Sequence, residues 1–403
     1  MMRKRYMTAT EAAERLGISR ATLYAYVSRG LIRSEEGSDA TRERRYHAED
    51  VEKLAARKTY RRDPGKVAQD ALHWGSPMLD SSLTLIHDHR VYYRGHDAAA
   101  LARETTFEEV AAILWTGRDS GGAAFFAGEP PVTPLESLPS FAALPSASRM
   151  AAALAFAGAD DLAAYDLSAP AVARTGGRIV RLLARVAAPE PGASRSEARL
   201  AARLACVWGC PKAARLIDAA LILCADHELN ASSFAARVAA STDANPYAVV
   251  AAGLAALTGF KHGGNTELTE AFLSQTGDPA RLVSERLRRG ERIPGFGHRL
   301  YPEGDPRAVT LTALMREYAP GAPVLARLDA LSQTMGEIKG VAPNIDLTLA
   351  ALARLLDLPT GTPLTLFAIG RSAGWIAHAI EQYTAGDLIR PRARYVGEMP
   401  SEG

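Results

Sequence analysis

The hydrophobic pattern of the first sixty residues predicts two short helices joined by a tight turn. Apolar residues recur three or four positions apart in residues 11–16 and again in residues 20–27. Thr8 or Thr10 can cap the first helix, Glu11 follows Thr8 at the spacing of a capping box, and Gly17 is suited to end the helix. An extended stretch, an arginine-rich segment and a closing helix follow. This order is typical of a winged helix-turn-helix module.

A different pattern begins after a linker at residues 60–65. Apolar residues then follow helical spacing to the C-terminus, and few runs alternate as strands do. One exception, residues 83–93, predicts a hairpin that turns at Asp88 and His89. Two segments rich in Pro, Gly and Ser predict loops: residues 117–148 and 187–196.

These patterns divide the chain into two domains. Residues 1–62 predict a small winged helix-turn-helix domain, and residues 63–403 predict an all-helical body. The clearest helical stretches of the body are residues 106–115, 196–210 and 246–257. The predicted fold class is therefore mainly α.

Composition is globular, but the charge is unevenly distributed. Of the 403 residues, 47% are hydrophobic and 23% are charged. The net charge of +2 conceals an asymmetry, because residues 1–62 hold 15 Lys and Arg against 9 Asp and Glu, and the remainder holds 32 against 36. A basic segment on a nearly neutral body indicates an anionic partner for that segment, with a solubilising surface as the alternative.

The three cysteines indicate a reducing compartment. Cys206, Cys210 and Cys224 form an odd, sparse set without histidines at zinc-ligand spacing, so we expect packing residues and no metal. The basic start lacks the apolar stretch of a signal peptide, and no apolar run reaches the length of a membrane span. We therefore expect a cytoplasmic protein without a membrane partner.

Two runs in the N-terminal segment, TATEAAERLGISRATLYAYVSRGLI and RERRYHAEDVEKL, resemble the MerR-type and excisionase-type winged helix. The second helix of such a module enters the major groove of DNA. The side chains expected near the duplex are Ser19, Arg20, Thr22, Tyr24 and Tyr26. The wing arginines expected on phosphates are Arg42, Arg44 and Arg45. The alternative is a module that docks a protein or braces a dimer without affinity for DNA.

Side chains suited to acid–base chemistry cluster in the last third of the chain. His262 and His298 stand beside glycines on predicted turns, and Asp346 stands where a helix begins. Three arginines lie in apolar or proline-fixed surroundings: Arg307, Arg371 and Arg390. Two imidazoles and a carboxylate can remove a proton beside a carbonyl and stabilise the resulting enol. Three guanidinium groups suit a substrate with two or three carboxylates.

This set of residues favours formation of a carbon–carbon bond between an enol and a small keto acid. The sequence contains no Gly-x-Ser-x-Gly nucleophile motif and no phosphate-cradling Gly-x-x-x-x-Gly-Lys loop. Hydrolysis through a covalent intermediate and phosphoryl transfer therefore fit the sequence less well.

Five ordered segments carry a second resemblance: KHGGNTE, PGFGHRLYPEGDPRA, APNID, FAIGRSAGW and IRPRARYVG. They resemble the signature segments of citrate synthases and 2-methylcitrate synthases. The run VYYRGHDAAALARETTFEEVAAILWTG is similar to that family's N-terminal segment, so the likeness covers about residues 80–397. It implies an all-α homodimer or higher oligomer, in which a large domain and a small domain, roughly residues 263–350, close over the substrates.

The resemblance also implies roles for individual residues. His262 would hold the thioester carbonyl of acetyl-CoA or propionyl-CoA, Asp346 would take the α-proton, and His298 would donate to the ketone of oxaloacetate. The residues implied to bind or enclose oxaloacetate are His227, Arg307, Arg371, Arg390 (from the partner subunit) and Phe367. The residues implied to lie against the adenine of CoA are Gly295, Phe296 and Gly297. No cofactor is implied beyond the CoA thioester, which is a substrate.

Two departures from the family pattern leave the acyl-CoA preference open. Asn265, Thr266 and Glu267 stand where the family usually has Ala, Asn and Glu, and Leu347–Leu349 replaces an aromatic pair and a small residue. Neither change removes a proposed catalytic group. We expect an acyl-CoA:oxaloacetate condensing enzyme. The alternatives are a transcription regulator with a synthase-like metabolite sensor, and an enzyme whose N-terminal module only docks a protein.

Overall fold

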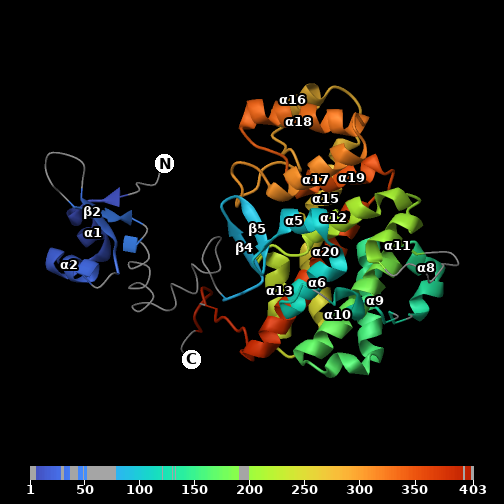
Figure 1. Cartoon of the computed structure of the whole chain (residues 1–403), viewed down its shortest axis with the longest axis horizontal. Coiled ribbons are helices and arrows are strands. Elements are labelled where there is room, and N and C mark those ends of the chain that lie inside the picture. The colour runs from blue at the N-terminus through green and yellow to red at the C-terminus, as the bar shows by residue number, and fades with distance from the viewer. Residues whose placement is uncertain are drawn as a thin grey trace. The chain divides into compact units, whose positions relative to one another are not determined.

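The chain forms two compact units, which Figure 1 draws in a computed structural model. One unit comprises residues 1–80 with 391–403, and the other comprises residues 81–390. The structure describes residues 6–28, 31–36, 44–48, 50–51, 79–119, 121–128, 130–131, 133–189, 199–393 and 395–400. The predicted boundary at residue 62 and the predicted linker lie outside the described residues, so this part of the domain division stays a prediction.

Two helices and a three-stranded antiparallel sheet form the described part of the first unit. The helices are α1, Ala9–Leu16, and α2, Arg20–Ser28. The strands, in sheet order, are β1 (Tyr6–Met7), β3 (Arg44–His47) and β2 (Ser34–Glu36). α1 packs against both α2 and β3. The core residues are Ala12, Ala13, Leu16, Leu23, Ile32, Tyr46 and Val51.

Local chemistry fixes the start and end of α1. The Thr8 hydroxyl accepts a hydrogen bond from the Glu11 N–H at 3.3 Å, and the Glu11 carboxylate accepts one from the Thr8 N–H at 2.9 Å. Gly17 ends the helix in the left-handed conformation, with φ of 57°. Both predictions are confirmed. Of the predicted closing helix, residues 48, 50 and 51 are helical, and the rest lies outside the described residues.

The second unit begins with the predicted hairpin. Strand β4 is Thr84–His87, β5 is Arg90–Tyr93, and β6, His96–Asp97, pairs with β5. Asp88 and His89 both have positive φ, 46° and 59°, as a two-residue type I′ turn requires.

Helices make up most of the remainder. The helices up to the first histidine of the site are α5 (Ala98–Glu104), α6 (Phe107–Thr116), α7 (Gly122–Phe125), η1 (Pro134–Ser137), α8 (Pro139–Ala142), α9 (Ser146–Asp160), η2 (Leu162–Tyr165), α10 (Ala169–Ala187), α11 (Leu200–Val207), η3 (Pro211–Ala213) and α12 (Ala214–Cys224). Those that follow are α13 (Ala231–Ala240), α14 (Pro246–Leu257), α15 (Asn265–Leu273), α16 (Pro279–Arg288), α17 (Pro306–Tyr318), α18 (Pro323–Lys339), α19 (Ile345–Leu355) and α20 (Thr362–Ala385).

Helix α20 is the central element of this unit. It is buried almost continuously from Thr362 to Ile380, and α6, α10, α12, α13 and α14 pack around it. At one end of the unit, α16 and α18 pack on each other, and α18 also packs on α19 (Figure 1). α16 and α18 lie within the predicted small subdomain of residues 263–350, and α19 begins there and extends to Leu355. The independence of this subdomain stays a prediction.

The predicted loop at residues 117–148 is wrong in part. It contains α7, η1 and α8, and α9 already begins at Ser146. These short elements lack the periodicity that reveals longer helices, and proline in the first turn of η1 and α8 sets their start. The predicted helix at residues 196–210 is shorter in the structure, where α11 spans Leu200–Val207. Among the described residues, no helix is long and apolar enough to cross a membrane.

Candidate active site

His262 lies on a glycine turn between α14 and α15. A Cβ on Gly264 would lie 2.4 Å from the Thr258 carbonyl oxygen, so only glycine lets this turn pass so close to the end of α14. The His262 Nε2 lies 2.9 Å from the Ser232 hydroxyl, which also accepts a hydrogen bond from the Trp375 indole at 3.2 Å. The turn and these partners hold the imidazole in one orientation.

His262 is neutral near pH 7. Burial, and then the charges of Arg371 and Arg307, lower the pKa of His262 to about 4. The neighbouring Phe367 ring lies edge-on, with 6.2 Å between ring centroids. A neutral imidazole in apolar surroundings can donate one hydrogen bond without adding a positive charge to the site.

His298 lies on a loop that pairs with the segment leading into α19. Gly297 donates from its N–H to the Ala342 carbonyl at 2.8 Å, and Asn344 donates from its N–H to the Gly295 carbonyl at 2.9 Å. The His298 Nδ1 accepts a hydrogen bond from the Leu300 N–H at 3.2 Å. An accepting Nδ1 leaves the proton of neutral His298 on Nε2. Burial and then Arg307 lower the pKa of His298 to about 4.

His227 belongs to the same cluster of rings. Its Nε2 lies 2.6 Å from the Tyr301 hydroxyl, and its ring centroid lies 5.2 Å from that of His298. Burial, followed by the charges of Arg307 and Arg371, holds the pKa of His227 well below its usual value. Three neutral imidazoles therefore lie close to two guanidinium groups.

Asp346 lies in the first turn of α19, where Asn344 caps the helix. The Asn344 side chain accepts from the Asp346 N–H at 3.1 Å, and the Asn265 amide donates to Asp346 Oδ2 at 2.7 Å. Only 9% of the Asp346 surface is exposed. Burial raises the pKa of Asp346 to about 6, although the hydrogen bond from Asn265 acts in the opposite direction. The group is a buried carboxylate that can accept a proton near neutral pH.

The two buried arginines of the site have different partners. Arg307 donates from Nε and Nη2 to the two oxygens of Asp305, at 2.9 and 2.8 Å. Burial opposes ionisation of both groups, but their mutual attraction outweighs it, so the pKa of Asp305 falls and that of Arg307 rises. Asp305 also accepts from the Ile345 N–H at 3.0 Å, which ties α17 to α19.

Within the described residues, Arg371 forms no ion pair with a carboxylate. It is 1% exposed, and its Nε donates to the Cys224 carbonyl at 2.8 Å. Its Nη1 and Nη2 are buried without a hydrogen-bond partner among the described residues. The guanidinium lies 5.0 Å from the centroid of the Phe367 ring. Because an unpaired buried cation is costly, these two nitrogens identify a site for an anionic ligand.

The structure therefore brings together most of the predicted site. The convergent residues are His227, His262, His298, Arg307, Asp346, Phe367 and Arg371. Gly295 and Gly297 have φ of 83° and 72° and lie on the loop that carries His298. Arg390 is not part of this cluster within one chain: it is exposed, and about 20 Å of helix separates Arg371 from the end of α20.

Comparison with known proteins identifies the family to which a chain with this site belongs. The family model described as "Citrate synthase, C-terminal domain" matches residues 72–392. The chain belongs to the citrate synthase family. A citrate synthase of Haloferax volcanii is 41% identical over 192 residues, 46% of this chain and 51% of that protein. A 2-methylcitrate synthase 2 of Corynebacterium glutamicum is 30% identical over 348 residues, 77% of this chain and 89% of that protein. In the first of these two matches, the chain therefore spans about half the length of its relative.

Solved structures agree with the family and confirm the predicted mainly α fold. Citrate synthase from Thermotoga maritima matches with a TM-score of 0.68 and 29% identity, over 82% of this chain and 96% of that one. Citrate synthase from Thermoplasma acidophilum, solved with carboxymethyl coenzyme A and oxaloacetate, gives 0.70 and 25%, over 83% and 97%. A second family model, described as a helix-turn-helix domain, matches residues 6–59.

Sequence reasoning missed several residues that hold this citrate synthase-like site together. Tyr301 contacts His227, Asp305 neutralises Arg307, and Ser232 contacts His262. Asp305 carried a signal, because aspartate followed by proline is typical of a helix N-terminus. Ser232 and Tyr301 carried none, since only the fold brings them to the histidines. Among the described residues, no group of three or more His, Cys, Asp or Glu could hold a metal ion.

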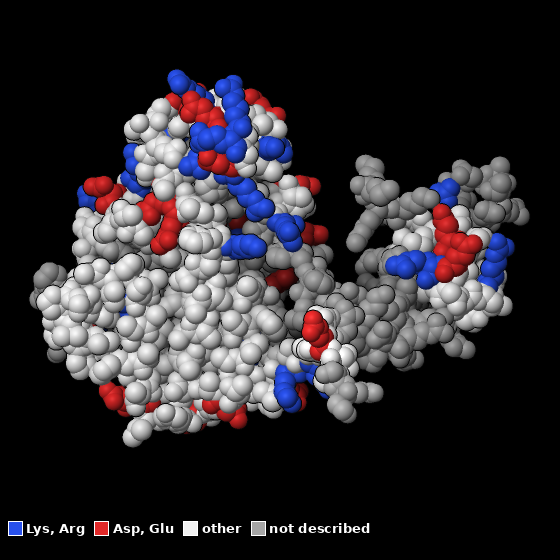
Figure 2. All heavy atoms as spheres, turned by 180° about the vertical axis from the view of Figure 1, so that it is seen from behind, with Lys and Arg blue, Asp and Glu red and all other residues white. Residues whose placement is uncertain are grey.

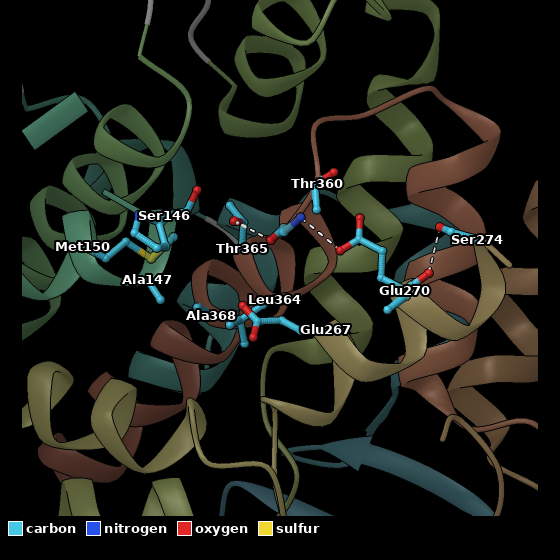
Figure 3. A pocket seen from close by; sticks show the side chains of 13 residues that line it. Ser146, Ala147, Met150, Glu267, Glu270, Ser274, Thr360, Leu364, Thr365 and Ala368 are labelled. Carbon is cyan, nitrogen blue, oxygen red and sulfur yellow. Dashed lines mark hydrogen bonds between the residues drawn. The ribbon is translucent and has the colours of Figure 1, made fainter. Parts of the chain in front are cut away.

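A separate pocket of about 500 Å³ lies between α9, α15 and the start of α20 (Figure 3). Glu267 and Glu270 line it, and Glu270 accepts from the Gly361 N–H at 3.0 Å. None of the proposed catalytic side chains lines this pocket. Asn265 contacts Asp346, whereas Glu267, two residues later on α15, lines the separate pocket.

The proposed DNA-facing residues of the first unit are only partly described. Ser19, Arg20, Tyr24, Arg44 and Arg45 are exposed, and Thr22 is half-buried. Tyr26 instead packs partly against the core of the unit, because it faces the same side of α2 as the buried residues. Arg42 lies outside the described residues.

The cysteines were predicted to be packing residues, and only Cys224 is fully buried among the three. Cys224 is buried, Cys210 is partly buried against the core, and Cys206 is exposed at the end of α11. Cys206 is therefore not a packing residue, because the short α11 presents that position to solvent.

Proposed function

We propose that this protein condenses an acyl-CoA with oxaloacetate and then hydrolyses the product thioester, releasing CoA and citrate or 2-methylcitrate. The observation that carries the proposal is the buried guanidinium of Arg371, which lies beside neutral imidazoles and the carboxylate of Asp346. Two of its nitrogens have no hydrogen-bond partner among the residues that the structure describes. A dicarboxylic keto acid supplies the missing anion. The carboxylate of Asp346 supplies the base that removes a proton from the acyl group, which must then attack the keto acid to form the carbon–carbon bond.

Asp346 and His262 act on the acyl group in this proposal. Asp346 removes a proton from the carbon beside the thioester carbonyl, and His262 donates a hydrogen bond to the enol oxygen. In the structure the Ser232 hydroxyl donates to Asn230 Oδ1 at 2.8 Å. Asn230 Oδ1 also accepts from two backbone N–H groups, at 3.0 and 3.1 Å, so it keeps two donors if the hydroxyl turns to donate to His262 Nε2 instead. That donation would leave the proton of the neutral ring on Nδ1.

His298 and the arginines act on oxaloacetate. Neutral His298, with its proton on Nε2, donates to the ketone oxygen as negative charge develops there. Arg371 and Arg307 bind carboxylates, Phe367 lines the cleft, and His227 is oriented by Tyr301 toward the same ligand. No cofactor enters this scheme, because the CoA thioester itself activates the α-carbon.

The loop of Gly295, Phe296 and Gly297 is the proposed contact for the adenine of CoA. Its backbone pairing with residues 342–344 couples the CoA loop to the start of α19. We propose that residues 263–350 move as a small domain and close over both substrates, excluding water until hydrolysis. The acyl group is acetyl or propionyl, since this chain is similar both to citrate synthases and to 2-methylcitrate synthases.

The proposed assembly is a homodimer in which Arg390 completes the partner's site. Figure 2 shows one side of the second unit with few charged side chains. Helix α14 contains no charged residue, and its exposed positions are Ala248 and Ala255. The adjacent α9 exposes Ala155 and Phe156. Exposed apolar helices of this kind are typical of subunit interfaces.

An end-point assay tests the condensing activity. The full chain, mixed with oxaloacetate and either acetyl-CoA or propionyl-CoA, should release free CoA, which a thiol reagent measures. Omission of oxaloacetate is the control. A folded protein that releases no CoA with either thioester contradicts the proposal and favours the metabolite-sensing regulator.

The helix-turn-helix unit supports a second role, binding of DNA. Exposed Arg20, Arg44 and Arg45 flank the helix and wing that would contact a duplex. A gel shift with the full chain and with residues 1–62 deleted tests this role, and binding should weaken steeply as salt rises. Equal retardation by both proteins assigns the unit to protein docking. A cytoplasmic location stays a prediction from the free cysteines.

A further inference from the structure

Asn265 connects the proposed base to the turn that carries His262. Its side-chain amide donates to Asp346 Oδ2 at 2.7 Å. Its N–H donates to the His262 carbonyl at 3.0 Å, and its own carbonyl accepts from the Thr269 hydroxyl at 2.7 Å. The backbone of Asn265 is therefore fixed on both sides, so its amide has a defined position relative to both proposed catalytic groups.

The carboxylate of Asp346 depends on this one donor. Among the described residues, no other group donates a hydrogen bond to either carboxylate oxygen of Asp346. The side chain lies in the first turn of α19 and is 91% removed from solvent, with 9% of its surface exposed. A buried carboxylate with one fixed oxygen has its other oxygen available to a ligand.

We propose that Asn265 is a positioning residue of the condensation: its amide anchors one oxygen of Asp346 and leaves the other oriented toward the acyl α-carbon. This inference rests on the proposed function. Asn265 also favours the ionised base, since burial raises the pKa of Asp346 to about 6 and the Asn265 hydrogen bond opposes that rise. A proton acceptor in so buried a site needs such a donor to stay charged near pH 7.

The resemblance to the family does not imply this contact. The family usually has alanine directly after His-Gly-Gly, and alanine has no side-chain donor. The amide at position 265 therefore lies outside what the resemblance implies, in which the asparagine stands one position later. The alternative is a purely structural amide that stabilises the start of α15 and has no effect on the base.

Asn265→Ala in the full-length protein separates the two. We expect kcat for CoA release to fall about tenfold and the acid limb of its pH profile to move up by about one unit, because a hydrogen bond to a charged group is lost. The KM for oxaloacetate should stay within about twofold. The deuterium isotope effect with methyl-deuterated acetyl-CoA should increase, since proton removal becomes slower.

Two further variants keep the test decisive. Ser274→Ala removes a 2.8 Å hydrogen bond from the same helix to the Glu270 carbonyl, away from Asp346, and should leave the pH profile unchanged. Asn265→Asp places a second carboxylate against Asp346, so it should move the acid limb to higher pH than Asn265→Ala does. The aspartate variant provides the test if the alanine variant folds poorly. Circular dichroism melting reports folding for each.

The outcomes distinguish the inference from the function beneath it. Failure of the unaltered chain to release CoA rejects the condensing function. If the unaltered chain is active while both Asn265 variants keep the same acid limb and isotope effect, that result rejects the positioning role of Asn265 and leaves the condensing function standing. A shifted limb with an unchanged KM for oxaloacetate supports it.

Discussion

The two sides of the proposed site hold buried groups of opposite charge. The keto-acid side is cationic. Arg307 is matched by Asp305, while two nitrogens of Arg371 have no hydrogen-bond partner in the described part of the chain. The acyl side holds one carboxylate, Asp346, with a neutral donor, Asn265. Burial lowers the pKa of Arg371 and raises that of Asp346, so on both sides it disfavours the charged form.

This difference shows that the arginine pair is not a symmetric clamp. Asp305 of the same chain already pairs with Arg307, whereas Nη1 and Nη2 of Arg371 have no hydrogen-bond partner among the described residues, so we propose that the substrate carboxylate binds mainly to Arg371. The acyl side needs no such counter-ion in this proposal, since the proposed thioester substrate is neutral at the reacting carbon. Variants on the two sides should therefore affect different kinetic parameters.

The largest effect is expected on the acyl side. Asp346→Ala and His262→Ala should each reduce kcat for CoA release by about 100- to 10,000-fold, because each removes a positioned proton-transfer or enol-stabilising group. Substrate-saturated assays on the folded variants measure this. Near-normal turnover in both would contradict the assignment of the acyl side.

The next effect is expected on the keto-acid side. Arg371→Ala should raise the KM for oxaloacetate about a hundredfold, because two charge-assisted hydrogen bonds to a carboxylate are lost. Initial rates against oxaloacetate concentration measure it, with Arg316→Ala, an exposed arginine paired with Asp329, as the control. An unchanged oxaloacetate dependence would show that the unpaired nitrogens of Arg371 do not bind this substrate.

The pH dependence of kcat should reflect the base alone. The raised pKa of Asp346, about 6, means that the carboxyl is protonated below that pH, so kcat should fall about tenfold per unit there. His262 and His298, each with a pKa of about 4, stay neutral through this range. If kcat instead falls only near pH 4, the titrating group is one of the imidazoles and not Asp346.

The smallest effect is expected for a residue that only orients another. Tyr301→Phe removes the 2.6 Å contact with His227 and should raise the KM for oxaloacetate about fivefold, in keeping with the loss of one neutral hydrogen bond. Its kcat should change less. A larger loss of kcat than of oxaloacetate affinity would indicate that Tyr301 touches the reacting atoms.

The sequence predicted the elements whose signals are local. The capping box at Thr8, the hairpin turn at Asp88 and the helix α14 match the structure because each depends on neighbouring residues. The short helices at residues 117–148 were not predicted, since segments of four residues acquire their helical form from the surface they pack against.

The identities of the proposed catalytic groups, two loop histidines, one aspartate at a helix start and buried arginines, were determined by the sequence alone, because glycines, caps and charges leave local signals. The tertiary structure decided which charges are matched. Asp305, the N-cap of α17, pairs with Arg307 only two residues later, whereas Asn265 reaches Asp346 from 81 residues away. Contacts between distant segments depend on how helices pack, and no local pattern records that packing.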